Sequence, residues 1–96
     1  MTGLSSYDAG IAAATEAGRE MAENGRAVVA ERLRQLLAAT NLSPPTDEEI
    51  DRGFDVRISV AYVEVREVAL VRGLSPEQAD DVSSAFLVAA TAGRTQ

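Results

Sequence analysis

The chain has 96 residues and a formal net charge of −6, from 15 acidic and nine basic side chains. It contains neither Cys nor His, which excludes disulfides, thiolate metal sites and thiol catalysis and removes the commonest general base. Every basic residue is Arg, so lysine-dependent Schiff-base chemistry is excluded, and the acidic balance disfavours direct binding to nucleic acid or to anionic membranes.

The first predicted helix covers about residues 7–39 and follows a loose tail. Its apolar face keeps one phase through Asn24-Gly25, with small residues first and larger ones later: Ile11, Ala14, Gly18, Ala22, Gly25, Val29, Leu33 and Leu36. The larger side chains predict that the second half of the helix holds more of the core. Because Asn-Gly is a strong turn signal, a turn at this point is the alternative, and it would give four helices.

A loop over 40–45 separates the first helix from the second, since its two consecutive prolines cannot continue a helix. Thr46 then supplies a cap, and Glu49 stands at the position that completes a capping box. The second helix is predicted over 47–72, with Gly73 as the residue that ends it.

The second helix is apolar on two opposite sides. One face carries Phe54, Ile58, Ala61, Tyr62, Val65, Val68 and Ala69, and the other carries Val56, Val63 and Leu70 with Val60 and Val71 beside them. A helix with two apolar faces lies between two partners. We therefore predict a homodimer interface at Val56, Val60, Val63, Leu70 and Val71. A strand over 56–65, paired with a second copy, is the alternative, because β-branched residues alternate along part of it.

The third helix is predicted over 76–92. Ser75 caps it, Pro76 occupies the first helical position and Gln78 completes a second capping box. Its inner face consists of Ala79, Val82, Ser83, Phe86, Ala89 and Ala90, whereas Leu87 and Val88 lie off that face.

These elements predict an all-α fold, an elongated three-helix or four-helix bundle that forms one domain over 1–96 with loose tails at 1–5 and 93–96. A first helix of this length would span about 50 Å, which exceeds the diameter of about 26 Å expected for a compact domain of this size. We therefore expect dimerisation to complete the bundle. The sequence has no apolar run near the ~20 residues that span a bilayer and no signal-peptide pattern, so we expect a cytoplasmic protein.

The sequence suggests no catalytic, cofactor-binding or metal-ligating residues, and we expect no cofactor. Acidic side chains on the first and third helices suit a protein partner with a basic surface. The candidate partner-binding residues are Glu16, Glu20, Glu23, Asp80 and Asp81. We interpret the chain as a non-enzymatic interaction module, a regulator or inhibitor of the kind that phages and mobile elements encode.

A small all-α enzyme or a carrier of anionic ligands is the second hypothesis. Such a protein would use Arg and carboxylates, and its sign would be a polar pocket lined by two or more inward Arg. The chain resembles the helical chorismate mutases in length and architecture, but Lys is absent and Arg19, Arg26 and Arg34 lie off the inner face of the first helix. The resemblance therefore assigns no residues.

A transcription regulator is the third hypothesis. Residues 69–75 resemble the turn of helix-turn-helix proteins, with Ala followed four residues later by Gly, an apolar residue and Ser. The helix that would enter DNA carries Glu77, Asp80 and Asp81 and no basic residue before Arg94. Phosphate would repel such a helix, so direct binding to nucleic acid is not expected.

Arg57 and Arg66 interrupt the apolar second helix, and two interpretations of them stay open. Each lies on a solvent-facing strip beside an acidic neighbour, or each pairs with an acidic residue of another chain at an interface.

Overall fold

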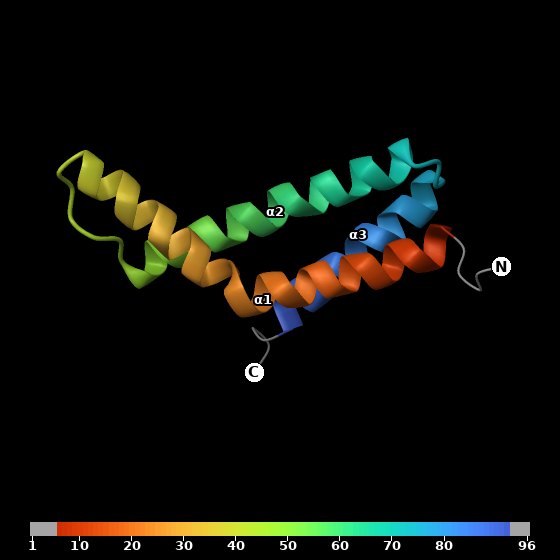
Figure 1. The fold of residues 1–96 in the computed structure, drawn as a ribbon, viewed down its shortest axis with the longest axis horizontal. Coiled ribbons are helices and arrows are strands. Elements are labelled where there is room, and N and C mark those ends of the chain that lie inside the picture. Colours follow the sequence, from red (N-terminus) through yellow and green to blue (C-terminus); the bar gives the residue numbers. More distant parts are fainter. Residues whose placement is uncertain (1–5, 93–96) are drawn as a thin grey trace.

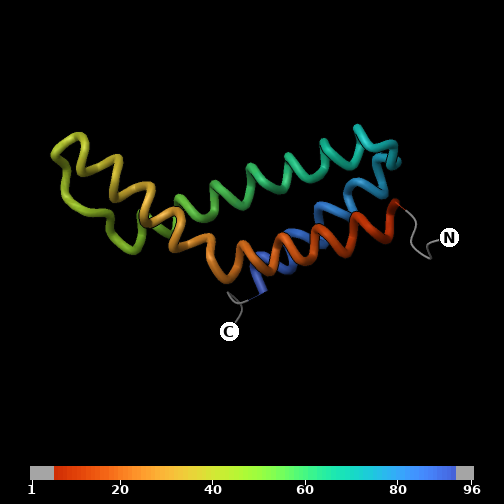
Figure 2. Tube along the Cα trace, in the orientation of Figure 1, coloured from red at the N-terminus to blue at the C-terminus, as the bar shows by residue number. Residues whose placement is uncertain are grey.

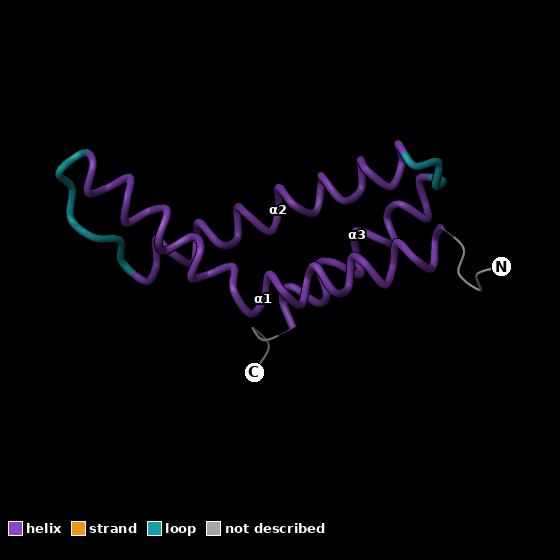
Figure 3. The backbone as a smooth tube through the Cα atoms, in the orientation of Figure 1, coloured by secondary structure: helices purple, strands orange, loops and turns teal. Residues whose placement is uncertain are grey.

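Three helices make up the computed structural model, which describes residues 6–92: α1 (Ser6–Ala39), α2 (Asp47–Val71) and α3 (Pro76–Thr91) (Figure 1). Within this range the residues between the helices are in loops or turns, Ala92 adds a 3₁₀ position after α3, and no residue is in a strand (Figure 3). The all-α prediction is confirmed, and 56–65 is helix. The tails predicted at 1–5 and 93–96 lie outside the described residues.

The helix α1 is continuous through Asn24-Gly25, so the turn alternative is wrong and the described residues contain no fourth helix. The helix bends in its middle, in the orange part of the tube in Figure 2. Gly25 is buried, and a Cβ atom there would lie 2.6 Å from Cε1 of the Phe54 ring. This glycine therefore serves the close approach of α2, and it does not form a turn.

The ends of the helices follow the predicted chemistry. The Thr46 hydroxyl accepts a hydrogen bond from the Glu49 amide at 3.2 Å while the Glu49 carboxylate accepts one from the Thr46 amide at 2.8 Å. Ser75 and Gln78 form the same reciprocal pair at the start of α3. Gly73 has a φ of 96°, which confirms its predicted position after α2.

The helix α3 organises the core, because it packs against both other helices while α1 and α2 contact each other less extensively. It runs parallel to α1 and antiparallel to α2 (Figure 1). Its buried residues are Ala79, Val82, Ser83, Phe86 and Ala90, all on the predicted inner face. Phe54 and Ile58 of α2 and Ala14 of α1 complete the buried cluster.

The prediction that the second half of α1 holds more of the core is wrong. Val29 is the one buried residue of α1 beyond Gly25, and Leu36 is 62% exposed. The 16-residue α3 lies along the first half of α1 (Figure 1), so the second half faces α2 alone. Ala22 and Val68 were also expected on inner faces, and both are exposed.

The elongated shape is confirmed. The principal extents are 55 × 30 × 23 Å, and the 34 residues of α1 account for about 51 Å of the longest at 1.5 Å per residue. Among the described residues, no helix combines the length and the apolar character that crossing a bilayer requires.

The first prediction concerns Gly18, where α1 and α3 meet most closely. A Cβ atom there would collide with the Phe86 carbonyl oxygen and lie 2.8 Å from Cβ of Ala89. Gly18→Ala should therefore lower the free energy of unfolding by about 1–3 kcal/mol through overpacking, although Ala favours helix by about 1 kcal/mol. Urea denaturation measures the change.

Asn24→Ala is the matched control, because Asn24 is exposed in the same helix. It should raise the free energy of unfolding by about 0.5 kcal/mol through helix propensity alone. A Gly18→Ala variant as stable as this control would contradict the close packing of α3 on α1.

Candidate protein-interaction surface

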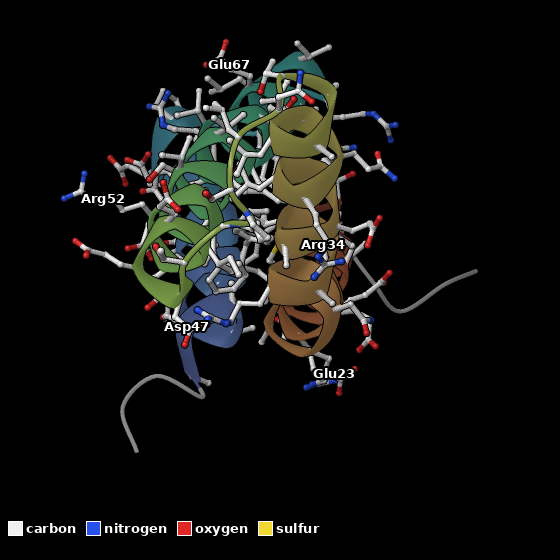
Figure 4. All side chains as sticks on the ribbon, turned by 90° about the vertical axis from the view of Figure 1, so that its left-hand side faces the viewer. Glu23, Arg34, Asp47, Arg52 and Glu67 are labelled. Atoms are coloured by element: carbon white, nitrogen blue, oxygen red, sulfur yellow. The ribbon has the colours of Figure 1, made fainter. Side chains whose placement is uncertain are left out.

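Four valines form an exposed apolar row on α2, which we call the valine stripe: Val56, Val60, Val63 and Val71, with exposed fractions of 62%, 52%, 57% and 85%. At 3.6 residues per turn their spacing keeps them on one side of the helix. Leu70, also predicted for the interface, is half-buried at the edge of this row. Glu67 lies within the row and points away from the bundle (Figure 4). The stripe is a surface that no described residue covers.

An open groove runs beside the stripe, between α1 and α2. It consists of two hollows of about 610 Å³ and 350 Å³, both lined by Glu64. The larger hollow lies between the start of α1 and the end of α2, and the smaller between the middle of α1 and the first half of α2. We call the two hollows together the α1/α2 groove. Its lining is mostly apolar, which suits a protein or ligand surface more than a reaction centre.

Small side chains on α1 keep the groove open. Ala9, Ala13 and Ala17 line the larger hollow from α1, opposite Val65 and Val68 of α2. Alanines four residues apart share one helix face and project little beyond the backbone. Since both helices pack mainly against α3 and contact each other less extensively, they do not close over this face. The exposure of Val68 follows from the same arrangement.

Arg57 and Glu64 lie where the groove meets the stripe, and both line the smaller hollow together with Arg32. The Nε atom of Arg57 is buried and has no hydrogen-bond partner. Neither Arg57 nor Glu64 belongs to any of the ion pairs that residues 6–92 form. This edge of α2 therefore carries one positive and one negative side chain that form no ion pair among the described residues.

Arg66 behaves differently, because it pairs within the chain. Its Nε donates to the Asp80 carboxylate of α3 at 2.5 Å, and its guanidinium lies 3.8 Å from Glu67. The hydrogen bond and charge of Asp80 raise the pKa of Arg66 above its ordinary value. Arg66 therefore joins α2 to α3.

The five acidic residues predicted to bind a partner separate into two groups. Asp80 and Asp81 lie at the start of α3, where Asp80 holds Arg66 and Asp81 accepts a hydrogen bond from the Tyr7 hydroxyl at 3.1 Å. Glu16, Glu20 and Glu23 lie further along α1, on its solvent-facing side, and we call them the acidic ridge.

Within the acidic ridge, Glu16 pairs with Arg19 at 2.8 Å. Glu20 and Glu23 form none of the ion pairs among the described residues, and Glu23 points away from the bundle (Figure 4). The ridge is therefore more open to a partner than the α3 acids, whose carboxylates already hold neighbouring helices.

The described residues offer little for other chemistry. They contain no group of three or more His, Cys, Asp or Glu side chains placed to hold a metal ion. The exposed side of α3 after the turn at 72–75 carries acidic residues in its first half and Leu87 and Val88 in its second, and α3 contains no Arg. A helix of that composition lacks the contacts to phosphate and guanine that DNA recognition uses.

Comparisons of the chain with protein-family models, with curated proteins and with solved structures found no match.

Sequence reasoning placed the valine stripe but missed the groove and the role of Arg57. Ala9, Ala13 and Ala17 repeat every four residues, and that spacing was the available signal for a second, small-residue face on α1. Likewise, Arg57 and Glu64 each follow a stripe valine by one residue, which places both on one edge of the stripe.

The second prediction concerns the contact between Tyr7 and Asp81. The hydrogen bond to Asp81, with desolvation and the charge of Asp81 as smaller causes, raises the pKa of Tyr7 above its ordinary 10.0. In a Tyr62→Phe background Tyr7 is the one remaining tyrosine. Its absorbance titration near 295 nm should shift to lower pH when Asp81→Asn is added.

The sign follows from linkage. Because the folded-state pKa of Tyr7 is raised, its contribution to stability is present below pH 10 and is lost as pH rises through the raised pKa. An unchanged titration in the Asp81→Asn variant would contradict the contact, and Glu77→Gln, at the exposed start of α3, is the matched control.

Proposed function

We propose that this protein is a non-enzymatic helical interaction module that forms a homodimer through the valine stripe and binds a protein partner through the acidic ridge. The observation that carries the proposal is the stripe, four exposed valines on one side of α2 beside an open apolar groove. Contiguous exposed apolar surface on a small acidic domain marks a site of association.

The energy scale is consistent with a stable dimer. Four half-exposed or more exposed valines from each copy give eight in the interface. Full burial of an exposed valine contributes about 1.5–3 kcal/mol, and association costs about 4–15 kcal/mol. The stripe valines are already partly covered, so their burial gives less than this full amount and is comparable with the cost of association. The other contacts of the interface therefore set the affinity.

The acidic ridge supports the second half of the proposal. Glu20 and Glu23 stand on the solvent-facing side of α1 without a basic neighbour in an ion pair. Such charges attract a partner with a basic surface and speed its docking. A small acidic protein that occupies the basic surface of another protein acts as a regulator or inhibitor of that protein, and we assign this role here.

One observation favours a second candidate, the binding of a small anion. Arg32 and Arg57 line the same hollow of about 350 Å³, and the buried Nε of Arg57 is unpaired. Two Arg side chains that line one hollow suit a carboxylate or a phosphate. An anion site would not account for the exposed valines of the adjoining stripe, so we rank the ligand carrier second.

The third prediction tests self-association. Val60→Glu places a charge in the middle of the stripe, and the cost of burying it should raise the dimer dissociation constant by more than tenfold. Sedimentation equilibrium at micromolar concentration measures the change.

Val88→Glu is the matched control, because Val88 is 69% exposed on α3, away from the stripe. Its mass should equal that of the unaltered chain. A monomeric unaltered chain, or equal effects of the two substitutions, would refute the proposed interface.

The fourth prediction tests the acidic ridge. Immobilised protein should retain a basic partner from lysate at moderate salt, and Glu20→Gln with Glu23→Gln should release it at lower salt because two partner-facing charges are removed. Glu48→Gln is the control, since Glu48 lies at the start of α2 and pairs with Arg52. Failure to retain any partner at moderate salt would count against the proposed function.

A further inference from the structure

We propose that the second copy lays its α2 antiparallel along the valine stripe, so that Arg57 of each copy pairs with Glu64 of the other. This inference rests on the proposed self-association and adds its geometry. It assigns to the dimer a reciprocal pair of charges on one edge of α2.

The two residues occupy equivalent places on the helix. Arg57 and Glu64 are seven residues apart, which is about 10 Å along the axis and nearly two full turns. Each follows a stripe valine, Val56 or Val63, by one residue, so both flank the stripe on the side of the α1/α2 groove. Val60 and Ala61 lie midway between them.

Both side chains are available for a partner. Arg57 and Glu64 form no ion pair among residues 6–92, and the Nε of Arg57 is buried without an acceptor. The other arginines of α2 that flank the stripe are engaged, Arg52 with Glu48 and Arg66 with Asp80. A carboxylate that reached the guanidinium of Arg57 would form a charge-assisted hydrogen bond with it.

Symmetry then selects the direction of the second helix. In an antiparallel pair with a two-fold axis near Val60 and Ala61, the same edge of both helices meets, and residues equally distant from the axis face each other. Arg57 and Glu64 satisfy that condition on both sides of the axis. This edge of the interface is therefore complementary to itself in charge.

A parallel pair would fail the same test. In a parallel two-fold pair the groove-side edge of one helix meets the opposite edge of the other. On α2 that opposite edge carries Arg52, Ser59 and Arg66. Arg57 would then approach Arg52 of the second copy, and like charges at an interface oppose association.

The groove leaves room for this arrangement. Met21, Val29 and Leu33 of α1 line the smaller hollow opposite Val56 and Val60. A second α2 lying over the stripe would cover this hollow as well. The single copy thus lacks one apolar wall, and the second copy supplies it together with the carboxylate for Arg57.

The test is an exchange of the two charges. Arg57→Glu alone and Glu64→Arg alone should each raise the dimer dissociation constant more than tenfold, because like charges then face each other across the axis. The double variant restores opposite charges and should return the constant to within about threefold of the original. Circular dichroism of each variant checks that the helices are intact.

Arg52→Glu is the matched control, on the other edge of the same helix. An antiparallel pair predicts little change in the dissociation constant, whereas a parallel pair predicts tighter association because the introduced carboxylate would face Arg57. A dimeric unaltered chain whose charge exchange is not rescued overturns the antiparallel register and leaves the proposed dimer standing. A monomeric unaltered chain overturns both.

A thiol crosslink gives an independent readout, because the chain contains no Cys. A mixture of Val56→Cys and Glu67→Cys chains should form a mixed disulfide dimer on mild oxidation, since these two stripe positions lie five and six residues on either side of Ala61, close to the axis, and neither variant alone should do so. Efficient crosslinking of Val56→Cys with itself would instead indicate a parallel pair. If citrate or phosphate raises the melting temperature and the charge exchange abolishes that effect without altering mass, Arg57 belongs to an anion site and the inference is wrong.

Discussion

The close approach of α3 to the glycine face of α1 is the constraint on which the rest of the structure depends. At Gly18 the backbone of α3 lies so near that even a methyl group would collide with the Phe86 carbonyl. That approach lets Phe86 and Val82 reach the buried cluster with Ile58 and Phe54 of α2. A domain with 4% aromatic residues has few large side chains to fill its interior, so it relies on close backbone packing instead.

The position of α3 also determines which surfaces of α1 and α2 remain exposed. The helix is 16 residues long and lies along one half of α1, while α1 and α2 contact each other less extensively. The stripe valines stand opposite the face of α2 that packs in the core, so they stay in solvent, and the alanines of α1 leave a groove beside them.

The capping residues and the apolar periodicity made the helix boundaries predictable. The packing of the helices against one another was harder to predict. The capping boxes at Thr46 and Ser75 and the glycine after α2 fixed the boundaries to within one or two residues. Continuity through Asn24-Gly25 followed from the unbroken apolar phase. The burial of Leu36 and Val68 was predicted wrongly, because periodicity marks an apolar face without indicating whether another helix extends far enough to cover it.

In the candidate site, too, some features could be predicted from the sequence and others could not. The stripe valines could be identified from their spacing alone, since they stand opposite the face that contains Phe54 and Ile58. The pairing of Arg66 with Asp80 and the isolation of Arg57 could not, because both depend on where α3 lies relative to α2. Whether a charged side chain on one edge of a helix has a partner can be decided only when the positions of the neighbouring helices are known.

Small-angle X-ray scattering of the unaltered chain over a range of micromolar concentrations tests the central claim most directly. A homodimer formed through the valine stripe has a mass twice the 10.1 kDa of one chain and a radius of gyration well above the 15.9 Å of the single copy. A mass of one chain at every concentration, with the radius of the single copy, would contradict it, because the valine stripe would then remain in solvent.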